Sequence, residues 1–129
     1  MRIAEYLLTH YYAHTNRLDL IPTKEQINQA ILNHPEKIVV IRRGQIRGIA
    51  FFLTLTDETY NRLETLDITK IPMIQALALE NGRNFHFVVL AADGYRTIKL
   101  GLRKIMKLNP KTISWWNPSF TKLHRYGVK

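Results

Sequence analysis

The chain of 129 residues contains no cysteine, which excludes disulfide bonds, thiolate metal sites and a catalytic thiol. It also lacks an apolar run of about 18 residues, so the sequence predicts no membrane-spanning helix. Polar residues such as Glu5 and His10 interrupt residues 1–20, which therefore do not resemble a signal peptide. From these absences we expect a cytoplasmic protein without a membrane partner.

Motifs of several enzyme classes are missing as well. There is no Gly-x-Ser-x-Gly segment and no Walker loop, which argues against hydrolases and nucleotidases. His10 and His14 have the spacing of two zinc ligands on a helix. Tyr11 stands in place of the glutamate of the zinc motif and no third ligand is evident, so we predict no metal site.

Acidic residues are also absent from the last part of the chain. Residues 1–93 contain ten acidic and ten basic residues, whereas residues 94–129 contain nine lysines and arginines and no acid. The whole net charge of +9 therefore lies in the C-terminal segment. Such asymmetry is typical of a surface that meets phosphates, nucleic acid or an acidic protein, and also of a solubilising face without a partner.

The remaining composition is that of an ordinary globular protein. Hydrophobic residues make up 46% of the chain and charged residues 22%, and the sequence shows no internal repeat or low-complexity stretch. We therefore expect residues 1–129 to form a single domain.

Apolar periodicity and turn residues divide the chain into helices and strands. A capping-box pattern from Thr23 to Gln26 begins a helix that should end before Pro35. Gly44 lies in a turn between two strands. We predict helices at 2–15 and 23–33, strands at 37–42 and 46–55, a loop or short helix at 57–66, a helix at 71–81, a strand at 84–91, a helix at 95–108, and a strand at 112–116. Residues 120–128 form a short strand or a helical turn, and the pattern favours the strand.

The strand–helix–strand order of residues 84–116 predicts a parallel pair of strands joined by a right-handed crossover. The strand at 84–91 is apolar at nearly every position, so we expect it to be central and buried on both faces. The earlier hairpin adds antiparallel strands to the same sheet. The predicted fold class is α+β, with a mixed, mostly antiparallel sheet and helices on both faces.

The helix predicted at 95–108 is strongly amphipathic at about 100° per residue. One face is apolar and carries Tyr95, Ile98, Leu102, Ile105 and Met106. The opposite face carries a basic stripe of Arg96, Lys99, Arg103 and Lys107.

This order of elements resembles the fold of the Gcn5-related N-acetyltransferases (GNAT), in which two helices precede an antiparallel hairpin, a central strand, a pyrophosphate-binding helix and a splayed strand. The resemblance covers residues 23–126 and is closest to short, divergent acyltransferase-like proteins of bacteria, phages and mobile elements, through the segments 113–116 and 122–126. The family's pyrophosphate motif, Arg/Gln-x-x-Gly-x-Gly/Ala, is matched at Arg96 and Gly101. Lys99 stands in place of its first glycine.

The resemblance implies an acetyl-CoA-dependent N-acyltransferase in which an amine attacks the thioester between the two parallel strands. It implies Tyr126 as the acid that protonates the departing thiolate, and Glu58 or His86 as the general base. The cofactor-binding positions that it implies are Leu90, Ala91 and Ala92 for the pantetheine arm, Gly94, Tyr95, Arg96, Thr97, Lys99 and Gly101 for the pyrophosphate, and Asn117 after the splayed strand.

Two other hypotheses stay open. A lysine at position 99 would crowd the phosphate cradle, which fits a catalytically degenerate phage or mobile-element protein with another role. Such a protein would bind nucleic acid or a host protein through its basic residues, namely Arg96, Lys99, Arg103, Lys107, Lys111, Lys122 and Arg125. An interaction protein that forms a homodimer by pairing its terminal strand with a second copy is the other hypothesis.

Overall fold

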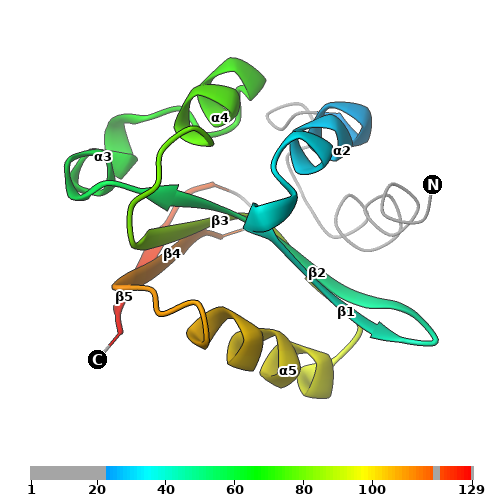
Figure 1. Ribbon diagram of the computed structural model, residues 1–129. Coiled ribbons are helices and arrows are strands. Elements are labelled where there is room, and N and C mark those ends of the chain that lie inside the picture. Colours follow the sequence, from blue (N-terminus) through cyan, green and yellow to red (C-terminus); the bar gives the residue numbers. More distant parts are fainter. Residues whose placement is uncertain (1–22, 118–119, 129) are drawn as a thin grey trace.

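The computed structural model describes residues 23–117 and 120–128. The helix predicted at 2–15, including His10 and His14, lies outside the described residues. The described part of the chain is a five-stranded sheet with helices on both of its faces (Figure 1).

The elements follow one another in the predicted order. Helix α2 (Lys24–Asn33) leads through a 3-10 turn (Pro35–Lys37) into the hairpin of β1 (Ile38–Arg43) and β2 (Gln45–Leu55). Helix α3 (Asp57–Asn61), a second 3-10 turn (Leu63–Thr65) and helix α4 (Ile71–Leu77) connect β2 to β3 (Asn84–Ala92). Helix α5 (Tyr95–Met106) then leads to β4 (Thr112–Trp116) and β5 (Leu123–Gly127).

The strands lie in the order β1-β2-β3-β4-β5, so neighbours in the sheet are also neighbours in the sequence. All pairs are antiparallel except β3 and β4, which run parallel because α5 crosses between them. Helices α2, α3 and α4 lie over one face of the sheet and α5 lies over the other (Figure 1). The mixed, mostly antiparallel sheet predicted from the sequence is therefore confirmed.

Local signals in the sequence fix two of these elements. The hydroxyl of Thr23 accepts a hydrogen bond from the backbone N–H of Gln26 at 3.2 Å, and the Gln26 side chain accepts from the Thr23 N–H at 2.9 Å. This is the predicted capping box at the start of α2. In the hairpin, Gly44 adopts a φ of 81°, a conformation that glycine takes without steric cost.

The sheet has a separate apolar core on each face. Alternate residues of β2, such as Phe51 and Leu53, pack against α2 and α4, where Ile27 and Ile74 are fully buried. Phe52 points to the opposite face, where it belongs to a smaller cluster beneath α5 that also contains Phe85, Phe87, Ile105 and Ile113. The core under α5 is therefore much smaller than the core under α2 and α4.

Helix α4 is shorter than the sequence predicts, because it ends at Leu77 instead of residue 81. The buried side chain of Lys37 donates to the backbone carbonyls of Ala78 at 2.5 Å and Glu80 at 2.6 Å. Burial lowers the pKa of the Lys37 ammonium, which neighbouring glutamates partly offset. The prediction missed this end because a distant lysine satisfies the carbonyls that another helical turn would have used.

The prediction that β3 is buried on both faces is right for only part of the strand. Residues 84–87 are buried, but Leu90 is 48% exposed and Ala92 is also exposed. The reason is that β3 extends beyond its pairing with β4, so its last residues have a strand neighbour only in β2.

Candidate functional site

The pairing of β3 with β4 is short and ends well before β3 does. Four residue pairs join the strands, from Asn84–Thr112 to Phe87–Trp115. Beyond this point β3 continues beside β2 as far as Ala92, while Trp116 pairs with β5. The two parallel strands therefore leave an opening at their carboxyl ends.

A cavity of about 650 Å³ lies between α5 and the sheet and reaches this opening. Strands β1, β2 and β3 form one wall and the apolar face of α5 forms the other. Aromatic side chains from β4 and β5 contribute at the side. The lining residues are Val39, Ile41, Gly48, Ile49, Ala50, Phe87, Leu90, Ala91, Ala92, Thr97, Ile98, Gly101, Leu102, Ile105, Met106, Ile113, Trp115 and Tyr126.

The first turn of α5 is held against β2. A Cβ atom on Gly48 would lie 2.5 Å from Cγ2 of Thr97, so the absence of a side chain permits the contact. The Thr97 hydroxyl donates to Oδ1 of Asp93 at 2.5 Å, and Oδ2 of Asp93 accepts from Arg47 at 3.2 Å. The bonds from Thr97 and Arg47 lower the pKa of the Asp93 carboxyl, so it is ionised at neutral pH.

The other end of α5 is held by Ile105, which is buried in the small core with Phe52 and Phe87. Between these two contacts the helix spans the cavity. Three residues of its apolar face, Ile98, Leu102 and Met106, remain 49%, 43% and 38% exposed. The apolar face predicted from the sequence is therefore present, but much of it lines the cavity.

Aromatic rings form the wall of the cavity on the side of β4 and β5. The ring of Trp115 stacks on His124, with centroids 5.2 Å apart, and on Tyr126, with centroids 6.5 Å apart. Tyr126 is 65% exposed and also lines the cavity, so both solvent and a cavity ligand can reach it.

The predicted cofactor-binding residues fall into three groups. Leu90, Ala91, Ala92, Thr97 and Gly101 line the cavity. Gly94, Tyr95, Arg96 and Lys99 lie at the exposed start of α5, where the ammonium of Lys99 lies 5.3 Å from the centre of the Tyr95 ring. Asn117 lies apart from both groups, because its side chain bonds Thr121 and the backbone of Lys122 in the turn before β5.

The segment matched to the family's pyrophosphate motif is helical. Arg96 to Gly101 all belong to α5, and Gly101 lies in the middle of that helix near Ile41 of β1. Gly101 is thus placed in the cavity wall, away from the helix N-terminus where the motif would bind phosphate. The backbone N–H groups at the N-terminus of α5 follow Gly94, and no side chain at this cap position accepts a hydrogen bond from them.

His86 lies in β3 with its side chain on the face away from the cavity. It is 1% exposed, and its Nδ1 lies 2.8 Å from the hydroxyl of Ser114 in β4. Burial, and to a lesser degree the charge of Arg125, lowers the pKa of the imidazole to about 4. His86 is therefore a neutral, buried side chain without access to a ligand in the cavity.

Glu58, the other base implied by the resemblance, is exposed on α3. Helix α3 lies on the face of the sheet opposite α5 (Figure 1). Neither Glu58 nor His86 is among the residues that line the cavity.

The basic residues of the C-terminal segment are divided between the two faces of the sheet. Arg96, Lys99, Arg103 and Lys107 are exposed on or directly after α5. On the other face, the guanidinium of Arg125 lies 4.7 Å from the ring centre of Tyr60 in α3, and Lys111 is paired with Asp57 at 3.1 Å. The structure therefore does not bring the seven predicted nucleic-acid-binding residues together on one face of the sheet.

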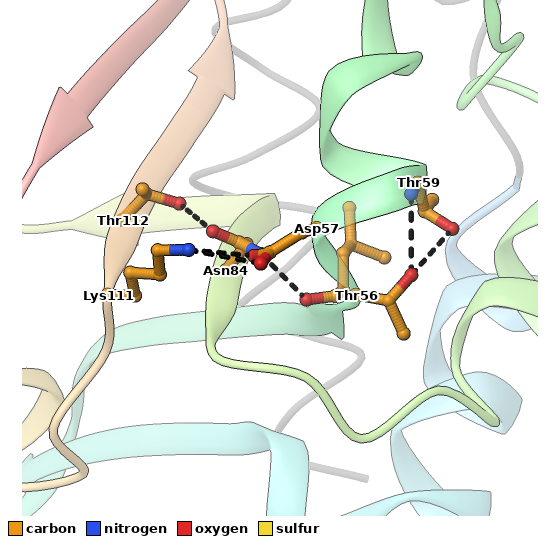
Figure 2. Close-up of polar contacts among 7 residues, drawn as sticks. Thr56, Asp57, Thr59, Asn84, Lys111 and Thr112 are labelled. Atoms are coloured by element: carbon orange, nitrogen blue, oxygen red, sulfur yellow. Dashed lines mark hydrogen bonds and ion pairs between the residues drawn. The ribbon is translucent and has the colours of Figure 1, made fainter.

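A polar network joins the start of α3 to β3 and β4 (Figure 2). The amide nitrogen of Asn84 donates to Asp57 at 2.8 Å and to the Leu55 carbonyl at 3.1 Å, and its oxygen accepts from Thr112 at 2.8 Å. The hydrogen bond from Asn84, followed by Lys111, lowers the pKa of the Asp57 carboxyl. Each member of this network has a hydrogen-bond or ion-pair partner within the protein. The network therefore has a structural role, in which it joins α3 to β3 and β4.

Sequence reasoning missed the β1 and β2 side of the cavity. Val39, Ile41, Gly48 and Ala50 are ordinary strand residues in the sequence, and nothing in their pattern shows that they face a cavity. Only Gly48, as an isolated glycine within a strand, indicates a close approach of another segment.

The described residues contain neither a candidate metal site nor a candidate membrane-spanning helix. Residues 23–117 and 120–128 contain no cluster of three histidine, aspartate or glutamate side chains that could hold a metal ion. In the same ranges, no helix has the length and apolar character needed to cross a membrane.

Comparisons with known proteins show similarity at the level of structure. No protein-family model matches the sequence, and no curated protein matches it. Among solved structures, the chain is similar to "GphF GNAT-like decarboxylase in complex with isobutyryl-CoA", with a TM-score of 0.61 and 11% sequence identity. The match covers 87% of this chain and 60% of the other, so this chain spans less than two thirds of its neighbour's length. The protein described here has a GNAT-like fold.

Proposed function

We propose that this protein binds an acyl-coenzyme A in the opening between β3 and β4 and transfers the acyl group to an amine. The observation that carries the proposal is the early end of the β3–β4 ladder at Phe87 and Trp115, beside an apolar cavity. In a GNAT-like fold this is the place where the two parallel strands separate. The structural neighbour with the same fold was solved with a CoA thioester, which supports this class of ligand.

The chemistry of the opening suits the parts of coenzyme A. The end of β3, from Leu90 to Ala92, lies beyond the ladder with β4, and a strand edge offers backbone groups to the two amides of pantetheine. At the start of α5, backbone N–H groups and the exposed side chains of Arg96 and Lys99 suit the pyrophosphate. The carboxylate of Asp93 lies nearby, but Arg47 and Thr97 already hold it.

The proposed reaction is direct transfer. The amine nitrogen forms a bond to the thioester carbonyl carbon, the carbon–sulfur bond breaks, and the thiolate takes a proton from the hydroxyl of Tyr126. The amine loses its extra proton to solvent, and the phenolate of Tyr126 regains a proton from solvent. Within the described residues, the cavity lining holds no carboxylate or imidazole, so the amine enters the reaction in its neutral form.

Titration calorimetry with coenzyme A, acetyl-CoA and isobutyryl-CoA tests binding. Leu90→Arg places a longer, charged side chain in the opening and should weaken binding of all three by more than about tenfold, because it occupies the space that the pantetheine arm would use. Leu79→Arg is the matched control, because Leu79 is 74% exposed and does not line the cavity. If none of the three ligands binds the unmodified protein, the proposal fails.

Release of the free thiol from acetyl-CoA in the presence of a panel of primary amines tests transfer. Tyr126→Phe should lower turnover by about a hundredfold while leaving the affinity for acetyl-CoA unchanged, because only the proton donor is lost. Tyr60→Phe, on the other face of the sheet, should keep full turnover. Thiol release that is equal in Tyr126→Phe and the unmodified protein contradicts the assigned role of Tyr126.

A further inference from the structure

The cavity under α5 is far larger than an acetyl group requires. A methyl group occupies a volume similar to that of a water molecule, about 30 Å³, and a cavity of about 150 Å³ already holds a benzene molecule. The cavity here measures about 650 Å³ and extends from the opening at Leu90 along α5 to Met106. The pantetheine arm beside Leu90 to Ala92 would take up part of this space, and an acetyl group would leave the remainder along α5 unused.

The size of the cavity follows from small residues placed opposite one another. Gly48, Ala50 and Ala92 lie on the face of the sheet toward the helix, and Gly101 faces them from the middle of α5. A Cβ atom on Gly101 would meet only Ile41, at 4.0 Å, so a larger side chain has room there. The contacts of Thr97 and Ile105 hold the helix at its two ends, and the space between them stays open.

The walls of the cavity select against polar ligands. Of the described side chains that line it, only Thr97 and Tyr126 carry a hydroxyl, Trp115 carries an indole N–H, and the others are apolar. The Thr97 hydroxyl already donates to Asp93. A sugar, a nucleotide base or a charged group inside would lose its hydrogen bonds to water without replacement, whereas an alkyl chain has none to lose.

We infer that the cavity under α5 binds an aliphatic acyl chain longer than acetyl. That the chain belongs to a coenzyme A thioester rests on the proposed function, because the cavity opens where that thioester would lie. The chain enters between Leu90 and Trp115 and runs beside Leu102 toward Met106. The partly exposed apolar face of α5 becomes covered when the chain is bound.

The inference is tested by calorimetric titration with acetyl-, butyryl-, hexanoyl- and octanoyl-CoA, and with coenzyme A alone. Affinity should rise by about two- to fourfold for each added methylene, up to the length that the cavity accepts. Coenzyme A alone measures the contribution of the proposed headgroup site. Equal affinities across the series would overturn the inference and leave the proposed function in place.

The variant Gly101→Leu fills the cavity and keeps a good helix former in α5, so it should fold at least as stably as the unmodified protein. It should flatten the dependence of affinity on chain length and leave the affinity for coenzyme A unchanged. Gln75→Leu, an exposed substitution on α4, is the control and should keep the full dependence. A dependence that survives in Gly101→Leu would place the chain elsewhere and overturn the inference.

A second variant and a second ligand separate the inference from the proposed function. Leu102→Gln places an amide in the wall without filling the space, and it should weaken octanoyl-CoA binding by about tenfold or more.

Free octanoate tests whether the cavity binds an aliphatic chain that carries no coenzyme A. If no coenzyme A ester binds, the proposed function fails, but octanoate binding that Gly101→Leu abolishes would still support an aliphatic chain in the cavity. If the chain dimerises and Gly101→Leu abolishes the dimer, the cavity is an interface between copies and the inference is overturned.

Discussion

Gly48 in β2 lies directly against Thr97 in α5, and the two residues fix the distance between the helix and the sheet at one end of the cavity. A Cβ atom on Gly48 would lie 2.5 Å from Cγ2 of Thr97, which is closer than real Cβ contacts come. Thr97 is 4% exposed and its hydroxyl is bound to Asp93, so its side chain has little freedom to move away.

The first prediction concerns this contact. Gly48→Ala should lower the free energy of unfolding by about 1–3 kcal/mol, because the added methyl group forces α5 or β2 to shift. Gly127→Ala is the control, since a Cβ atom there would meet nothing within 4 Å. Urea unfolding at neutral pH measures both. Equal stability of the two variants would show that Thr97 moves aside without cost.

The behaviour of α5 shows what the sequence can and cannot predict. Apolar residues at helical spacing predicted its extent and its apolar face, because periodicity depends only on neighbouring residues in the chain. How deeply that face is buried depends on the side chains opposite it. Those are Gly48, Ala50 and Ala92, which come from β2 and β3, and their small size leaves a cavity where the pattern alone suggests a packed core.

The candidate catalytic residues illustrate the same limit. The sequence placed His86 in the central strand, but β3 is apolar on both faces there, so no alternation indicated the direction of the side chain. The hydrogen bond between His86 and Ser114 depends on the parallel register of β3 and β4, which the sequence pattern does not define. Tyr126 was implied by the family resemblance, through its place after Asn117, and the pairing of β4 with β5 brings it to Trp115 and the cavity.

The second prediction concerns the network of Asn84. Asn84→Ala should lower the free energy of unfolding by about 2 kcal/mol, since the buried Leu55 carbonyl and the Thr112 hydroxyl lose their partner. The pKa of Asp57 should rise toward its usual value, because the hydrogen bond from Asn84 is the main cause of its lowering. Urea unfolding and an NMR titration of Asp57 measure the two effects. The exposed Asn81→Ala is the control, and a similar small loss in both variants would contradict the prediction.

The third prediction concerns the pH dependence of stability. The pKa of His86 is about 4 in the folded protein and about 6.5 in the unfolded chain, so the unfolded chain binds more protons between these values. Stability should therefore fall as the pH is lowered from 7, and this histidine should contribute a loss of about 3 kcal/mol by pH 4. His86→Gln removes the titrating group and keeps a partner for Ser114. Its unfolding free energy should depend less on pH than that of the unmodified protein, and parallel curves would refute the assignment.

The fourth prediction separates coenzyme A binding from the competing hypothesis of nucleic-acid binding. Coenzyme A carries few phosphates, so raising the salt concentration from about 50 to 200 mM should weaken its binding by about tenfold at most. A DNA duplex held by six or more basic residues would lose about a thousandfold or more in affinity over the same range.

Arg103→Glu combined with Lys107→Glu reverses two charges at the far end of α5 from the opening, so it should leave coenzyme A binding nearly unchanged. Calorimetric titrations of both ligands at both salt concentrations measure these effects. Duplex binding that collapses with salt and with the double variant, together with no response to coenzyme A, would mean that α5 serves nucleic acid and that the acyl-coenzyme A proposal is wrong.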